Sequence, residues 1–229
     1  MCVHFRCNPL RVFARNAWVK LSPHMNLIFD LGGVVVEWNP QTICAQAFED
    51  PALQQVALTH ILQHPDWLAL DRGSLARGDA IRRAASRTAW SPSAVDSFFD
   101  AVLASLRLKE ETVALMQRMH AAGHSLYCLS NMPHHALAYL EQNYSFWSLF
   151  SGRVISCQVG MCKPEPGIYA HLLKQCAMDP VQSVFIDDMQ VNVDAAAAFG
   201  IHPLRFDNAA QCASALNTWL NPVASSTYA

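Results

Sequence analysis

The chain has 229 residues, of which 52% are hydrophobic, and its formal net charge at pH 7 is −2. This length suits one α/β domain of moderate size with a sizeable core, and it leaves room for an inserted subdomain. The apolar residues form no run of the roughly 18 to 20 that a membrane-spanning helix needs, and the small charge gives no electrostatic case for nucleic acid. We therefore expect no membrane and no nucleic-acid partner.

The eight cysteines form no recognisable metal or disulfide motif. Five of them stand singly in apolar or helical contexts, with no C-x-x-C pair: Cys128, Cys157, Cys162, Cys176 and Cys212. Single buried cysteines are typical of proteins in a reducing compartment, which predicts a cytoplasmic location.

The first 24 residues differ from the rest of the chain. Four basic residues are interleaved with apolar ones, and no acidic residue precedes Asp30. This composition is typical of an organellar presequence, but Met25 stands directly before the first apolar run and offers a second start site. We expect residues 1–24 to be an N-terminal extension, either disordered or the product of a mis-set start, with a transit peptide as the alternative.

Five short apolar runs predict buried strands. They cover Asn26–Phe29, Ser125–Leu129, Arg153–Ser156, Val184–Ile186 and His202–Phe206. Helical patterns lie among these runs, at Glu110–Ala122, Ile168–Cys176 and Val191–Phe199, and some of these helices are followed by glycine. Strands that alternate with helices predict an α/β fold with a parallel sheet covered on both faces.

The segment from Gln41 to about Leu108 carries helix signals and no convincing strand. Pro51, Pro65 and the turn "DRGSLARG" divide it into about four expected helices. We expect residues 41–108 to form an all-helical cap inserted into a core of residues 25–40 and 109–221. A short C-terminal tail, residues 222–229, would follow.

Polar residues cluster after the predicted strands. In an open parallel sheet, ligands bind at the carboxyl ends of the strands, and the residues expected there are Asp30, Ser130, Asn131, Lys163, Asp187 and Asp188. A carboxylate that approaches a phosphate meets a repulsion of about 4 kcal/mol per unit-charge pair at 4 Å and an effective dielectric near 20. A divalent cation and a lysine offset this repulsion, so the set suits metal-assisted phosphoryl transfer.

Four segments carry a family resemblance: "FDLGGV", "CLSN", "KPEPGIY" and "FIDDMQVNVDAA". In this order they resemble the four motifs of the haloacid dehalogenase-like (HAD) hydrolase superfamily, and the resemblance extends over nearly everything from Met25 to Phe206. It implies a Rossmann-like, doubly wound core with a helical cap inserted after the first motif. It also implies a phosphatase that depends on Mg²⁺.

The resemblance also implies roles for single residues. Asp30 matches the nucleophile that forms an aspartyl-phosphate, Ser130 the residue that hydrogen-bonds the phosphoryl group, and Lys163 the residue that neutralises its charge. Asp187 and Asp188 match the acidic pair that holds Mg²⁺, with Asp188 the expected direct ligand.

Further residues are expected to complete the site. Asp30 and the backbone carbonyl of Gly32 would join the metal ligands, and Asn192 would support the acidic loop. We expect Asn131, Gly33 and, from the cap, Arg72 to contact the substrate.

Gly32 departs from the motif of most phosphatases in the superfamily, which have a second aspartate there as general acid. General acid–base assistance is worth about 10²- to 10⁴-fold in rate, so we expect poor turnover unless another group substitutes for this acid. The candidates are Glu37, Asp71, His134 and His135.

Two other readings remain open. The superfamily's metal-independent 2-haloacid dehalogenases also lack the second aspartate, but they are poor in acids at the fourth motif, where this chain has a pair that favours Mg²⁺. A catalytically weak phospho-binding member is the third possibility. The expected substrate is a small phosphorylated metabolite that resembles a sugar phosphate. The protein is expected to be a monomer or a homodimer.

Overall fold

The computed structural model describes residues 24–220, so the expectations for residues 1–23 and 222–229 lie outside the described residues. Within this range the chain forms a five-stranded sheet in which every pairing is parallel, with the order β3-β2-β1-β4-β5. Its strands are β1 (Asn26–Phe29), β2 (Ser125–Ser130), β3 (Phe150–Ile155), β4 (Ser183–Asp187) and β5 (His202–Arg205). The chain runs from β1 outward to β3 and then returns to β4 beside β1. This confirms the predicted α/β fold with a doubly wound parallel sheet.

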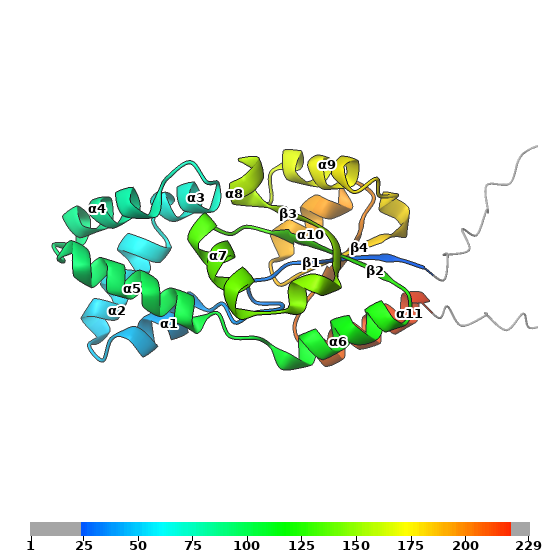
Figure 1. Ribbon diagram of the computed structural model, residues 1–229, viewed down its shortest axis with the longest axis horizontal. Helices are drawn as coiled ribbons and strands as arrows, with labels where there is room; N and C mark the ends of the chain where they lie inside the picture. Colours follow the sequence, from blue (N-terminus) through cyan, green and yellow to red (C-terminus); the bar gives the residue numbers. More distant parts are fainter. Residues whose placement is uncertain (1–23, 221–229) are drawn as a thin grey trace, which may run out of the picture.

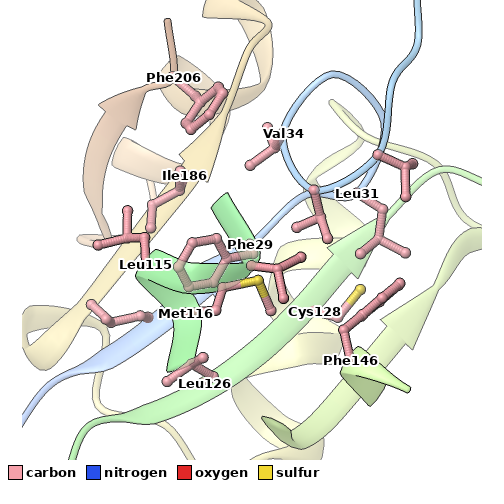
Figure 2. Close-up of a cluster of buried hydrophobic side chains, with 14 of the residues drawn as sticks. Phe29, Leu31, Val34, Leu115, Met116, Leu126, Cys128, Phe146, Ile186 and Phe206 are labelled. Atoms are coloured by element: carbon pink, nitrogen blue, oxygen red, sulfur yellow. The ribbon is translucent and has the colours of Figure 1, made fainter. Parts of the chain in front are cut away.

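Helices cover both faces of the sheet (Figure 1). They are α6 (Glu110–Ala121), α7 (His134–Asn143), α8 (Ser156–Val159), α9 (Pro166–Gln175), α10 (Gln190–Ala197) and α11 (Ala209–Leu220), with 3₁₀ turns at η2 (Phe146–Leu149) and η3 (Pro180–Gln182). Because successive side chains of a strand point to opposite faces, Phe29 packs with α6, α7 and α11 in one cluster, whereas Ile28 packs with α9 and α10 in another. Figure 2 shows Phe29 next to Leu115 and Met116 of α6. Each face of the sheet thus has its own buried core.

The segment between β1 and β2 is helical, as expected, but it contains more helices than the four expected. It consists of α1 (Pro40–Ala47), α2 (Pro51–Ala57), the π-helical turn η1 (Leu58–Leu62), α3 (Pro65–Asp71), α4 (Arg77–Thr88) and α5 (Pro92–Ser105). Proline at the first helical position is well tolerated because its missing N–H has no partner there anyway. Four of these α-helices begin in this way after a residue whose side chain caps the first turn.

The helices α1 to α5 have a hydrophobic cluster of their own, separate from the two clusters of the sheet. In Figure 1 they lie together beyond the carboxyl ends of the strands. Trp38, in the connection from β1 to α1, packs against both the cap cluster and the core. None of the helices within residues 24–220 has the length and apolar character that a membrane crossing requires.

Candidate active site

Two aspartates and a lysine meet at the carboxyl ends of β1 and β4. Asp30 follows β1 and Asp187 ends β4, and the parallel pairing of these strands places both at one edge of the sheet. The Lys163 ammonium lies 2.8 Å from Asp30 Oδ1 and 2.7 Å from Asp187 Oδ2. All three side chains are buried. Residues that are far apart in the sequence therefore form one charged cluster, as expected from the motifs.

Burial governs the electrostatics of this cluster. It raises the pKa of Asp30 to about 7 against the opposing charge of Lys163, and Asp187 adds to the rise. Burial would lower the pKa of Lys163, but the two carboxylates hold that pKa above its ordinary value. With Asp188 also ionised, three carboxylates and one ammonium leave a net charge of −2 here, so an additional cation would be favourable.

The acidic residues of the cluster fit a metal ion. Asp30, Asp187 and Asp188 each offer a carboxylate oxygen, and these oxygens lie within 4.8 Å of one another. Hard oxygen ligands of this kind suit Mg²⁺. Asp187 is the more constrained of the pair, because the Asn192 amide donates to both of its oxygens, at 3.0 and 3.1 Å, and the Met189 N–H donates to Oδ1 at 2.8 Å. Asp188 is less buried and lines the cavity described below.

Ser130 and Asn131, which follow one another at the end of β2, have different surroundings. The Ser130 hydroxyl is buried and close enough to Asp30 to lower the pKa of that carboxyl group, but no group within residues 24–220 meets the geometry of a hydrogen bond to it. It is therefore free to hydrogen-bond a ligand. The Asn131 amide instead donates to the Lys163 carbonyl at 2.9 Å and accepts from the Lys163 N–H at 2.8 Å. Asn131 thus holds the lysine loop, and because it also lines the cavity, its expected contact with substrate stays a prediction.

The two glycines after Asp30 are not equivalent. Gly33 has φ +77°, and a Cβ there would lie 2.5 Å from Asp188 Oδ2, so only glycine fits. Its N–H donates to Val36 O at 2.9 Å, which leaves this donor occupied rather than directed at a substrate. At Gly32 a Cβ would meet Trp38 at 3.4 Å, an ordinary contact. A side chain at position 32 is thus sterically acceptable, and metal binding by its carbonyl stays a prediction.

A cavity of about 320 Å³ opens above the charged cluster. We call five polar residues the floor: Asp30, Lys163 and Asp188, which line the cavity, and Ser130 and Asp187, which lie against Asp30 and Lys163. The cap and its connection contribute a facing set of apolar residues, which we call the roof: Trp38, Leu62, Trp67, Val102, Leu103 and Leu106. The Trp38 and Trp67 rings stack with centroids 5.8 Å apart. The cavity therefore places a hydrocarbon-like surface opposite the charges.

The end of α3 fastens the cap to the core. The Ser156 hydroxyl donates to the Asp71 carbonyl at 2.5 Å, and the Arg72 guanidinium pairs with the Glu165 carboxylate and donates to Gly160 O at 3.2 Å. Arg72 was expected to bind substrate. It is not among the described residues that line the cavity, and its guanidinium is paired with Glu165.

Next to this contact, Gly73 (φ +76°) passes so close to the Cys157 carbonyl that no side chain fits. The Asp71 side chain itself lines the cavity. Burial raises its pKa to about 7, Asp30 adds to the rise, and Lys163 opposes it.

The remaining candidates for the missing acid lie in other environments. Glu37 has a side chain that is 52% exposed and faces Lys109 at 3.8 Å, and His134 is exposed. His135 lines the cavity beside the Phe99 ring, with centroids 5.8 Å apart, and burial lowers its pKa to about 4. Sequence spacing cannot distinguish these four residues, because their positions depend on how the cap packs.

The fold and the site define an α/β protein with charged groups at the strand ends of a parallel sheet, beneath a helical cap. A family model described as haloacid dehalogenase-like hydrolase matches residues 25–200. The chain belongs to the haloacid dehalogenase-like hydrolases. The resemblance in the motifs is thus confirmed, and the chain is a hydrolase.

Similar proteins are known by sequence and by structure. The chain is 29% identical over 186 residues to a sesquiterpene phosphatase of Aspergillus oryzae, which covers 81% of this chain and 91% of that protein. A predicted HAD-like hydrolase from Porphyromonas gingivalis superposes with a TM-score of 0.71 at 24% identity, over 87% and 99% of the two chains. A HAD family enzyme from Bacteroides thetaiotaomicron, solved with magnesium and inorganic phosphate, has a TM-score of 0.66 at 22% identity, over 80% and 93%. These structural matches support the fold.

Proposed function

We propose that the protein is a Mg²⁺-dependent phosphatase that hydrolyses small phosphate monoesters through an aspartyl-phosphate on Asp30. The observation that carries this proposal is the floor of the cavity. There, Asp30 lies 2.8 Å from the Lys163 ammonium, and its oxygen lies within 4.8 Å of those of Asp187 and Asp188.

Each floor residue has a role in this reaction. An oxygen of ionised Asp30 attacks phosphorus, the bond to the leaving oxygen breaks, and the phosphoryl group is transferred to Asp30. Lys163 neutralises charge on the phosphoryl oxygens, and the unpaired Ser130 hydroxyl donates a hydrogen bond to one of them. Mg²⁺ held by Asp30, Asp187 and Asp188 would supply further positive charge next to the phosphoryl group.

The acidic pair favours phosphatase over dehalogenase chemistry. Three carboxylates so close together repel one another without a cation, and carbon–halogen cleavage in the family's dehalogenases requires no metal site. Asp187 and Asp188 would therefore destabilise a dehalogenase, which has no metal ion to offset their charge, whereas a phosphatase would need them to hold Mg²⁺.

The roof favours a substrate with an apolar organic group. Its six apolar side chains offer a sugar few hydrogen-bond partners, so hydroxyl groups buried there would lose their contacts with water. A hydrocarbon group gains about 0.8 kcal/mol for each buried CH₂. The similarity to a sesquiterpene phosphatase points in the same direction. We therefore place alkyl or prenyl phosphates ahead of the sugar phosphates expected from the sequence.

The proposal is tested by measuring phosphate release from n-octyl phosphate with Mg²⁺ and with EDTA, for the wild type and for Asp30→Asn. We expect release that requires Mg²⁺ and that disappears in Asp30→Asn. The same preparations are incubated with 2-chloropropionate, where metal-independent chloride release would establish the dehalogenase reading instead. A slowly decaying phosphoprotein without turnover would establish a phospho-binding member.

A further inference from the structure

We infer that Asp71, at the end of α3 in the cap, is the general acid that takes the place of the residue absent at Gly32. This inference rests on the proposed phosphatase function. The cap would then supply a reacting group in addition to the apolar roof.

The first argument is one of position. Of the described residues that line the cavity, five are titratable: Asp30, Asp71, His135, Lys163 and Asp188. The floor uses three of them for the nucleophile, the phosphoryl charge and the metal site, which leaves Asp71 and His135.

The environments of these two residues differ. The Asp71 side chain lines the same cavity as Asp30 and Lys163, and the charges of both shift the pKa of its carboxyl group. His135 is influenced instead by Arg77, His134 and Asp100, and it packs against Phe99 in the cap. Of these two residues, Asp71 is therefore the better candidate for the general acid, because it is the one influenced by the nucleophile Asp30.

The second argument is that the backbone around Asp71 is held rigidly against the core. The Asp71 carbonyl accepts a hydrogen bond from Ser156, the next residue is paired with Glu165, and Gly73 passes so close to the Cys157 carbonyl that a Cβ there would collide with it. Glu165 follows Lys163 by two residues, so this contact ties Asp71 to the loop that carries the catalytic ammonium. A proton donor needs such a fixed position relative to the leaving group.

The chemistry balances as follows. Protonated Asp71 gives its proton to the leaving oxygen as the phosphorus–oxygen bond breaks, which releases the alcohol. The resulting carboxylate then takes a proton from water as the water oxygen attacks the aspartyl-phosphate, so that inorganic phosphate leaves and Asp30 is regenerated. A pKa near 7 suits a carboxyl group that both gives and accepts a proton.

Two substrates with different leaving groups test this role in Asp71→Asn. n-Octanol is a poor leaving group that needs a proton, whereas p-nitrophenolate leaves readily without one. We expect kcat/KM for n-octyl phosphate to fall about 10²- to 10⁴-fold. With p-nitrophenyl phosphate, the first turnover should stay within about threefold of wild type and be followed by slow steady-state release, because the second step lacks its base.

Matched variants separate this role from a structural one. Asp79→Asn removes an exposed carboxyl group of the cap that pairs with Arg82 and should leave both substrates unaffected. Gly32→Asp places an acid at the position usual in the family. In the Asp71→Asn background it should restore at least tenfold in n-octyl phosphate hydrolysis, whereas in the wild type it should change the rate by less than tenfold.

Several results would overturn the inference. These are full n-octyl phosphate activity in Asp71→Asn, an equal loss for both substrates in the first turnover, or a rate increase of about 100-fold in Gly32→Asp alone, which would mean that no acid is present. The proposed function fails separately, because in that case Asp30→Asn would retain its Mg²⁺-dependent phosphate release.

Discussion

The floor and the roof of the cavity differ in origin and in chemistry. The floor comes from strand ends and adjoining loops of the core, and it is charged, buried and tied together by ion pairs. The roof comes from the cap and its connection, and it is apolar and built from stacked rings and leucines. Under the proposed function, reaction type and substrate preference would therefore be determined by separate parts of the chain.

This separation implies that the two sets can be changed independently. A change in the floor should affect every substrate alike, because the phosphoryl group is common to all of them. A change in the roof should affect only substrates with a large organic group. The four predictions below test this difference, in order of decreasing effect.

Removal of the cation from the floor should have the largest effect. Lys163→Met leaves Asp30 and Asp187 as buried carboxylates without their partner, which typically destabilises a protein by about 3–5 kcal/mol. We expect this loss in chemical denaturation of the metal-free protein at pH 8, with a smaller loss at pH 5, where Asp30 is protonated. Activity should fall on methyl and n-octyl phosphate in equal proportion. A loss confined to one substrate would mean that Lys163 does not act on the phosphoryl group.

Asp71 should destabilise the metal-free protein at high pH. The pKa of Asp71 is raised in the folded state, so the folded protein binds this proton more tightly than the unfolded chain does. The stability gained from the proton is fully present below about pH 4 and is lost as the pH rises through about 7. Asp71→Asn should therefore match the wild type near pH 4 and exceed its free energy of unfolding by about 2 kcal/mol at pH 8, a value reduced for partial exposure. Urea denaturation at both pH values measures this. A variant less stable than wild type at pH 8 would contradict the buried environment assigned to Asp71.

A polar group in the roof should weaken only apolar substrates. Leu103→Asn places an amide in the apolar lining, and we expect kcat/KM for n-octyl phosphate to fall about tenfold, equivalent to about 1.4 kcal/mol. Methyl phosphate does not reach the roof and should be unaffected. Leu53→Asn, at an exposed leucine of the cap, is the control and should change neither. A uniform loss in Leu103→Asn would argue that the roof serves stability alone.

The smallest effect is expected at the cap–core contact. Arg72 and Glu165 are 33% and 41% exposed, and ion pairs of this kind contribute less than about 1 kcal/mol to stability. If Arg72 only fastens the cap to the core, Arg72→Ala and Glu165→Gln should change kcat/KM by the same small factor. The double variant should change kcat/KM no further. A much larger effect of Arg72→Ala would restore the substrate-binding role expected from the sequence.

The sequence predicts the floor far better than the roof, for a physical reason. Each floor residue lies in a short motif, and four of the five lie at the end of a strand or directly after it. Parallel pairing brings these strand ends together without knowledge of the packing. Trp67 and Leu103 lie in helices where apolar residues at helical spacing predict a buried face but not a cavity. Their position over the site depends on how the cap closes on the core.

The same reason explains why the surroundings of single site residues could not be read from the sequence. Arg72 looks free to bind an anion in the sequence, but Glu165 pairs with it in the fold. Asn131 follows a strand and lines the cavity, but the sequence does not show that the nitrogen and the oxygen of its amide both bond the Lys163 backbone. The acid that replaces Gly32 could not be chosen among its four candidates until the structure separated Asp71 from Glu37.

The most direct test of this division is the ratio of kcat/KM for n-octyl phosphate to that for glucose 6-phosphate, measured with Mg²⁺ for the wild type and Leu103→Asn. We predict a ratio of at least about 30 in the wild type, consistent with the burial of a few CH₂ groups at about 0.8 kcal/mol each, and a clear decrease in the variant. A ratio near or below one in the wild type, or a ratio that Leu103→Asn leaves unchanged, would contradict the assignment of substrate preference to the apolar roof.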